Sequence, residues 1–333
     1  MAGDTHVLAH YLAPLRRRLD EEGVTELVVN RPGEYAVERA GAWIWHEASE
    51  LTEAALRPLA IAAAAFTRQD VTSQSPICST VLPSGERCQI ILPPAVEHIS
   101  LTLRKPSAKA LSLAEMVQAG LFETVARAGE AADPARRALL ACQSAGDWPG
   151  FFAAAVAARK NILISGATGS GKTTLAKALV QMIPADERLI TIEDARELTL
   201  PHRNAVHLVY AKDGAGLARV GPKELLEAAL RMRPDRILLQ ELRDGSAFFY
   251  LRNVNSGHPG SITTIHANSA ALAFEQLMLL IRESQAGAGM TRKDIAGLLR
   301  SSVDIVVQMK RQQGRFFVSE IAYEPAGPSL LAG

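Results

Sequence analysis

The sequence predicts an α/β fold, in which a domain built on a largely parallel sheet follows a smaller α+β domain. Short apolar runs alternate with longer helical patterns from Asn161 onward, which is typical of parallel strands covered by helices. The first half instead mixes helical spacing with hairpin patterns. The length of 333 residues is enough for about two domains.

Glycine and proline punctuation divides the first half into short elements. The expected helices span 6–19 and 52–67, and the expected strands span 25–30, 34–46 as a hairpin, 77–82, 87–92 and 100–104. An Ala-rich helical stretch follows, and Asp133-Pro134 and Asp147-Trp148-Pro149 punctuate its end. We therefore expect an N-terminal α+β domain over 1–105, a helical linker over 106–146 and a second domain over 147–333.

In the second domain the expected strands span 162–165, 189–193, 205–209, 236–240 and 261–266. Ligands of open α/β sheets bind at the carboxyl ends of the strands. The segments just after these runs are therefore where chemical motifs are expected.

A phosphate-binding loop follows the first of these strands. The stretch GATGSGKT fits the pattern G-x-x-x-x-G-K-T between a strand and a helix, whereas an ordinary Gly-rich turn would not require that context. Lys172 is expected to reach the β and γ phosphates of ATP, and the Thr173 hydroxyl to ligate Mg²⁺. The residues expected to contact nucleotide are Gly166, Ala167, Thr168, Gly169, Ser170, Gly171, Lys172, Thr173 and Thr174.

Hydrolysis would also need carboxylates, and two candidates stand at strand ends. Glu193, in TIEDAREL, is the expected water-activating base, and Glu241, in RMRPDRILLQELRD, is expected to bind magnesium through water. The alternative for both is a solvated acid that caps a helix or pairs with Arg196 or Arg243.

Two histidines flank a further strand in GHPGSITTIHAN. His258 is readily explained as a turn residue, and His266 as a buried histidine with its hydrogen bonds satisfied. The position of His266 at a strand end would also let it sense the γ-phosphate.

The bulk composition narrows the functional classes. The formal net charge is only +1 and aromatic residues make up 5%, which argues against a nucleic-acid motor with a basic, stacking channel. No apolar run approaches the roughly 20 residues of a membrane span, so we expect a cytoplasmic protein. Cys78, Cys88 and Cys142 form no C-x-x-C pair and predict neither zinc nor disulfides.

The four motifs, taken in order, resemble those of the secretion-superfamily traffic ATPases, most closely the small hexameric ATPase of VirB-type type IV secretion systems. The resemblance is strong over 161–307 and weaker in SGERCQIILPP and LTLRKPS. It implies a RecA-like P-loop domain and a homo-oligomer in the form of a six-membered ring, associated peripherally with the cytoplasmic face of the inner membrane. It also implies partners among the other secretion ATPases and inner-membrane channel components, with no direct binding of nucleic acid.

The resemblance also implies roles for single residues. Lys172 and Thr173 match the family's phosphate and magnesium residues, Glu193 its catalytic carboxylate, Glu241 its Walker-B acid, and His266 its histidine-box residue. Two arginines of the first domain, Arg87 and Arg104, match residues that approach the phosphates when domains close. The alternative for both is a solubilising charge at a strand edge.

Three other functions compete with a type IV secretion motor. A type II secretion or pilus-retraction motor would share the chemistry, but such proteins usually carry Gly where this chain has Gln240, and the larger ones often add a four-cysteine module. A nucleic-acid motor conflicts with the balanced charge. A scaffold that binds ATP without hydrolysing it conflicts with the intact Lys172, Glu193 and Glu241.

Overall fold

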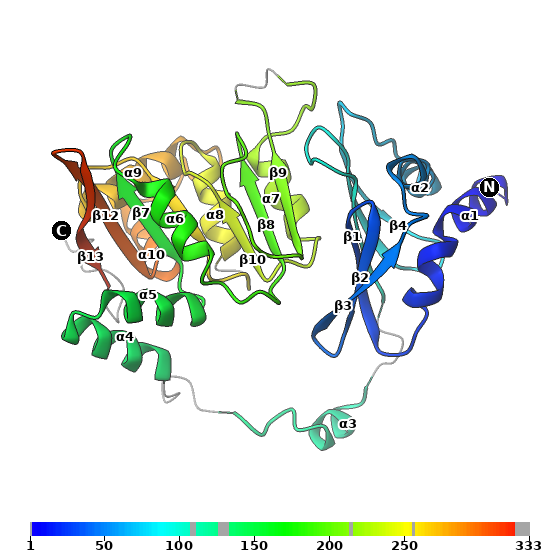
Figure 1. The fold of residues 1–333 in the computed structure, drawn as a ribbon, viewed down its shortest axis with the longest axis horizontal. Coiled ribbons are helices and arrows are strands. Elements are labelled where there is room, and N and C mark those ends of the chain that lie inside the picture. The colour runs from blue at the N-terminus through cyan, green and yellow to red at the C-terminus, as the bar shows by residue number, and fades with distance from the viewer. Residues whose placement is uncertain (1, 107–110, 126–132, 213–215, 255–256, 324–333) are drawn as a thin grey trace.

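The computed structural model describes residues 2–106, 111–125, 133–212, 216–254 and 257–323. Within these ranges the chain forms two domains, each built on β-sheets, and a helical linker passes below both in Figure 1. The mixed helix and strand content and the mainly parallel sheets of the second domain confirm the predicted fold class. The predicted boundaries at 105 and 146 stay a prediction, which this division of the elements supports.

The first domain is a six-stranded antiparallel sheet with the order β3-β2-β1-β6-β5-β4. Helices α1 and α2 contact each other and lie on one side of this sheet, where their apolar side chains meet those of the strands in a common core (Figure 1). The elements are α1 (Ala2–Leu19), β1 (Val24–Arg31), β2 (Gly33–Arg39), β3 (Ala42–Ala48), α2 (Glu53–Phe66), β4 (Ile77–Val81), β5 (Arg87–Ile91) and β6 (Ser100–Arg104).

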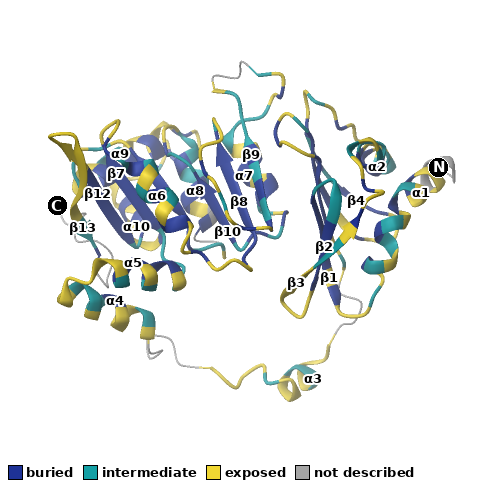
Figure 2. Cartoon of the chain, viewed as in Figure 1, coloured by how far each residue is buried: buried dark blue, intermediate teal, exposed yellow. Residues whose placement is uncertain are grey.

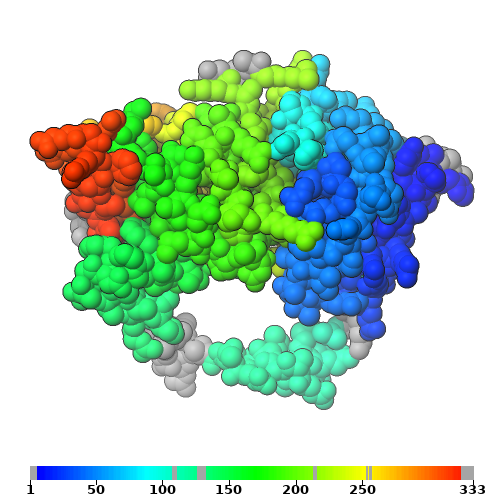
Figure 3. Space-filling model, in the orientation of Figure 1, coloured from blue at the N-terminus to red at the C-terminus, as the bar shows by residue number. Residues whose placement is uncertain are grey.

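The linker contains α3 (Leu113–Gln118) and α4 (Pro134–Ala145), and α5 (Trp148–Ala157) begins the second domain. Helix α3 buries none of its residues, whereas α4 and α5 pack on the second domain through Leu139 and Phe151. Figures 2 and 3 show the same contrast, because α3 lies exposed and apart from both domains. Only the later part of the linker is therefore anchored by a core.

The second domain contains two neighbouring sheets, with the orders β10-β8-β9 and β11-β7-β12-β13. A parallel bridge between Glu241 and Thr264 joins them beside β10 and β11. The strands are β7 (Ile162–Gly166), β8 (Leu189–Glu193), β9 (Ala205–Val209), β10 (Arg236–Leu239), β11 (Ile262–Ile265), β12 (Ile305–Gln312) and β13 (Arg315–Ala322), and the helices are α6 (Lys172–Val180), α7 (Pro222–Ala229), α8 (Ser246–Val254), α9 (Ala270–Glu283) and α10 (Arg292–Ser302).

Burial follows the parallel pairing. Every residue of β7, β8, β10 and β11 is buried, as expected for parallel strands that helices cover on both faces. All the strand pairs in this domain are parallel except β12 with β13, which form an antiparallel hairpin. The sequence analysis did not predict this hairpin.

The two domains meet at a polar interface. The guanidinium of Arg188, which is fully buried, donates to Asn30 Oδ1 at 2.8 Å and to Thr102 Oγ1 at 3.4 Å, and both acceptors belong to the first domain. Arg233 forms an ion pair with Glu38. The interface lies along the β9 edge of the second domain (Figure 1), on the opposite side of its sheets from β12 and β13.

Among the described residues, no helix is both long and apolar enough to cross a membrane.

Candidate functional site

The phosphate-binding loop folds between β7 and α6, as its motif predicts. Gly169 and Gly171 have φ angles of +71° and +91°, a region that residues with a Cβ rarely adopt. At Gly166 a Cβ would lie 2.4 Å from Ser170 Oγ and 2.7 Å from the carbonyl oxygen of Met309. These glycines let the backbone close into a cradle at the N-terminus of α6, where N–H groups and the helix dipole favour an anion.

Lys172 lies in this cradle and is only 7% exposed. Its Nζ donates to the carbonyl oxygens of Gly166 at 2.8 Å and Ala167 at 3.0 Å. Burial lowers the pKa of Lys172, and the nearby Glu241 acts in the opposite direction. The ammonium is thus held where the loop would receive a phosphate.

A chain of polar contacts runs from Lys172 to the second sheet. Its Nζ lies 3.4 Å from His266 Nδ1, and His266 Nε2 lies 2.6 Å from Glu241 Oε1. The imidazole of His266 therefore lies between Lys172 and Glu241, with one ring nitrogen near each. Glu241 also pairs with Arg243, whose Nη1 lies 2.6 Å from Asp194 Oδ2. Lys172, His266 and Glu241 therefore meet, although they lie in three separate motifs.

Glu193 ends the strand that follows the P-loop helix, as predicted from the sequence. It is 0% exposed at the end of β8, and β10 and β11 separate β8 from the P-loop strand β7. One carboxylate oxygen accepts from Thr191 Oγ1 at 2.7 Å, and the other accepts from the backbone N–H groups of Glu197 and Leu198 at 2.8 and 2.9 Å. Both carboxylate oxygens of Glu193 are therefore occupied by hydrogen bonds from within the chain.

The acidity of Glu193 has the same origin. Burial raises its pKa, but hydrogen bonds from His207, Leu198, Glu197 and Thr191 together lower it by more, so the carboxylate is stabilised in its charged form. The assignment of Glu193 as the water-activating base stays a prediction. What the carboxylate does here is hold the turn that carries Asp194 against Arg243.

Arg87 and Arg104 lie away from the cradle in this chain. They are cross-strand neighbours on β5 and β6, and both are exposed. Arg104 Nε lies 3.4 Å from Glu26 Oε1 in the same sheet. Among the described residues, none of their contacts is with the phosphate-binding loop.

The structure also brings to the loop two residues that the sequence analysis missed. Arg311 and Phe316, on the β12–β13 hairpin, line a cavity of about 400 Å³ together with Gly169, Gly171, Lys172, Thr173, Thr174 and Gly314. Gly314, which lies between two apolar runs, could have indicated the hairpin turn, but not the proximity of the strands to the loop. The volume of this cavity lies within the range of roughly 300 to 1,000 Å³ that is usual for small-molecule sites.

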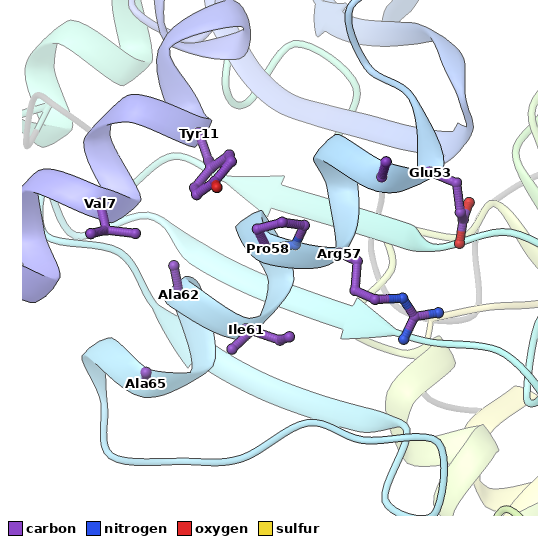
Figure 4. Close-up of a pocket in the computed structure, with 9 residues that line it drawn as sticks. Val7, Tyr11, Glu53, Arg57, Pro58, Ile61, Ala62 and Ala65 are labelled. Carbon is purple, nitrogen blue, oxygen red and sulfur yellow. The ribbon is translucent and has the colours of Figure 1, made fainter.

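A larger cavity, of about 600 Å³, lies elsewhere. It is a mainly apolar groove between α1 and α2, and Figure 4 shows Val7, Tyr11, Pro58 and Ile61 among its lining residues. Glu53 and Arg57 lie at one end of it (Figure 4). This groove contains none of the motif residues, whereas the smaller cavity is lined by the phosphate-binding loop.

The loop fits a nucleotide phosphate. Ser170 Oγ is buried and, among the described residues, has no hydrogen-bond partner, as expected of a hydroxyl that a ligand would satisfy. Thr173 lies in the first turn of α6 and lines the cavity. Within the described parts of the chain no group of three His, Cys, Asp or Glu could hold a metal alone. A Mg²⁺ ion here would therefore depend on nucleotide and water oxygens as well as Thr173.

Comparisons with known proteins agree with this geometry. A family model described as Type II/IV secretion system protein matches residues 9–316. The chain is 49% identical over 327 residues to the type IV secretion system protein VirB11 of Bartonella quintana, covering 94% of this chain and 92% of that one. Protein VirB11 of Agrobacterium fabrum is 42% identical over 315 residues, with coverages of 93% and 91%.

A solved structure matches along almost the whole chain. The crystal structure of the VirB11 ATPase from the Brucella suis type IV secretion system, in complex with sulphate, superposes with a TM-score of 0.93 at 42% identity. The match covers 99% of this chain and 98% of that one. With the family model and these relatives in agreement over more than nine-tenths of its length, the chain belongs to the family of Type II/IV secretion system proteins.

Proposed function

We propose that this chain is an ATPase that powers type IV secretion, through substrate translocation or assembly of the machine or its pilus. The observation that carries the proposal is the meeting of Lys172, His266 and Glu241 at a complete phosphate-binding loop. The VirB11 relatives favour this function over a type II secretion or pilus-retraction motor. A nucleotide-binding scaffold without turnover is less consistent with the Lys172, His266 and Glu241 set at the loop.

Each group has a role that follows from its position. The loop N–H groups and Lys172 would bind the β and γ phosphates, and Thr173 would ligate Mg²⁺, which neutralises phosphate charge when bound. Glu241 is the carboxylate nearest to Lys172 in the chain of contacts, so we assign to it the orientation of the attacking water or of magnesium-bound water. His266 links Glu241 to Lys172 and would respond to the charge at the γ-phosphate.

Glu193 becomes a positioning residue in this proposal. Its carboxylate holds the backbone of 197–198, and the same turn presents Asp194 to Arg243, which in turn contacts Glu241. Loss of Glu193 would therefore disturb Glu241 indirectly. The resemblance-based role of a catalytic base would instead require Glu193 to become exposed when nucleotide binds.

We further propose that Arg87 and Arg104 act in trans. Both are exposed in this chain and lie away from its own loop. They would therefore contact the phosphate-binding loop of a neighbouring subunit in a homo-oligomer, which the family resemblance implies is a hexamer. Each would stabilise charge on the γ-phosphoryl group as domains rotate. The assembly would lie at the cytoplasmic face of the inner membrane with the other secretion ATPases and channel components.

Steady-state phosphate release with ATP and Mg²⁺ tests the enzymatic part. Lys172→Ala and Glu241→Gln should abolish turnover, and Lys177→Ala, on the same helix, is the matched control that should retain it. Glu193→Gln separates the two roles: partial activity together with normal ATP binding supports positioning, and complete loss with normal stability supports a base. A wild-type protein that binds ATP but releases no phosphate in any oligomeric state would refute the proposal.

Complementation in trans tests the arginines. Arg104→Ala and Lys172→Ala subunits, each inactive alone, should regain turnover when mixed, because a mixed ring contains sites with an intact loop beside an intact arginine. If mixing restores nothing although mass measurement shows mixed oligomers, the arginines do not act between subunits.

A further inference from the structure

The β12–β13 hairpin lies against the phosphate-binding loop on one face. A Cβ built on Gly171 would lie 2.9 Å from two ring carbons of Phe316, so the ring packs directly on this glycine. A Cβ on Gly169 would lie 3.7 Å from Arg311 Nη1. The hairpin is therefore a wall of the same cavity that the loop lines.

Strand pairing explains why these two side chains act together. Arg311 and Phe316 are cross-strand partners in the hairpin, so their side chains share one face of it. The next pair along, Lys310 with Phe317, points to the opposite face, because side chains alternate along a strand. The hairpin thus presents one cation and one aromatic ring to the loop, and an equivalent set away from it.

Both side chains have unused binding capacity. Phe316 is 53% exposed although its ring contacts Gly171, so one side of the ring remains open. Arg311 is exposed and makes no hydrogen bond or ion pair with any described residue. A free guanidinium at the mouth of a phosphate cradle can bind phosphate through charge-assisted hydrogen bonds.

We propose that this hairpin completes the nucleotide site, with Phe316 stacking on the purine base and Arg311 binding the phosphates from the side opposite Lys172. The inference rests on the proposed function, because it assigns further residues to the same nucleotide. The cavity divides accordingly: phosphates lie at the loop between Lys172 and Arg311, and the base lies against the open side of the Phe316 ring.

Calorimetric titration of the full-length protein with two probes tests each half of the assignment. ADP carries base and phosphates, whereas inorganic pyrophosphate carries phosphates alone. Phe316→Ala should weaken ADP binding about tenfold or more, the usual effect of losing an aromatic–base stack, and leave pyrophosphate binding unchanged. Phe316→Tyr should restore ADP binding.

Arg311→Gln should instead weaken both probes, by about tenfold each, since it removes a charged donor to phosphate. The matched controls are Phe317→Ala and Lys310→Gln, which make the same chemical changes on the opposite face of the hairpin and should alter neither affinity. All four positions are exposed, so unfolding curves of the variants should overlay that of the wild type.

The inference is overturned if Phe316→Ala behaves like Phe317→Ala, or if it weakens pyrophosphate as much as ADP, because the ring would then only shape the loop. The assignment of Arg311 to the phosphates is overturned if Arg311→Gln binds the two probes with the same affinities as Lys310→Gln. A wild type that binds neither probe would instead remove the proposed function, and the inference with it.

Discussion

A buried carboxyl group in the first sheet should make folding stability depend on pH. Glu26, on β1, is 3% exposed, and its Oε2 has no hydrogen-bond partner among the described residues. Burial is the main cause that raises its pKa to about 7; Arg104 lowers it, the cross-strand neighbour Glu38 raises it, and Arg233 and Arg188 lower it. At neutral pH this group is therefore ionised only at a cost.

The sign and size of the effect follow from linkage. Because the pKa of about 7 in the folded state exceeds the ordinary 4.5, the folded state favours the protonated form. The contribution of Glu26 to the free energy of unfolding is fully present below pH 4.5 and is lost as the pH rises through 7. At 1.36 kcal/mol per pH unit the total loss is about 3 kcal/mol. Glu26→Gln removes this loss, so the gain over wild type should be about 2.5 kcal/mol larger at pH 8 than at pH 5.

Urea unfolding followed by tryptophan fluorescence measures this gain where it arises. Trp43 and Trp45 lie on β3 of the same sheet, and a Trp148→Phe background removes the tryptophan at the start of α5. The exposed Glu47→Gln in the same background is the matched control and should show no such pH dependence. An equal difference between Glu26→Gln and wild type at pH 5 and pH 8 would show that Glu26 titrates normally and refute the reasoning.

Three further predictions concern buried polar groups. Arg236→Met should lower the free energy of unfolding by about 3 kcal/mol, because the buried Glu187, which Arg236 contacts at 2.6 and 2.9 Å, keeps only the 3.4 Å ion pair with Arg159. Adding Glu187→Leu should recover part of the loss in urea titrations. Glu193→Gln should destabilise the protein above pH 4.5, and the deficit in urea titrations should close as the pH falls, since the folded state holds the pKa of Glu193 below its ordinary value. Asn30→Ala should cost about 1–3 kcal/mol and leave the linker more susceptible to proteolysis, because the buried Arg188 loses a partner across the domain interface; an unchanged cleavage rate would contradict this.

Local patterns predicted most of the strands because burial leaves a direct trace in the sequence. The run 189–193 is apolar up to its final glutamate, and it forms β8 over the same residues. The run 100–104 likewise forms β6 without a shift. The hairpin of β12 and β13 was missed because β13, with the sequence RFFVSEIA, does not alternate apolar and polar residues and is exposed in all but its last two residues, so no one-sided hydrophobic pattern marks it.

The site was predictable only in part. The phosphate-binding loop is a contiguous motif whose glycines and lysine act through their own backbone, and sequence alone therefore identified it. Glu193 and Glu241 look alike in sequence, since each stands at the end of an apolar run with a charged residue one or two positions after it. Their surroundings differ because β8 and β10 lie at different distances from β7 in the sheet order.

By itself, then, the sequence determined the fold class, the order of the motifs and the residues that cradle phosphate, because all of these depend on neighbours along the chain. Only the tertiary structure decided that Glu193 is enclosed, that Glu241 reaches Lys172 through His266, and that Arg311 and Phe316 face the loop. These contacts join segments tens to more than a hundred residues apart. Strand order and side-chain direction fix them, and neither is encoded in any single stretch of sequence.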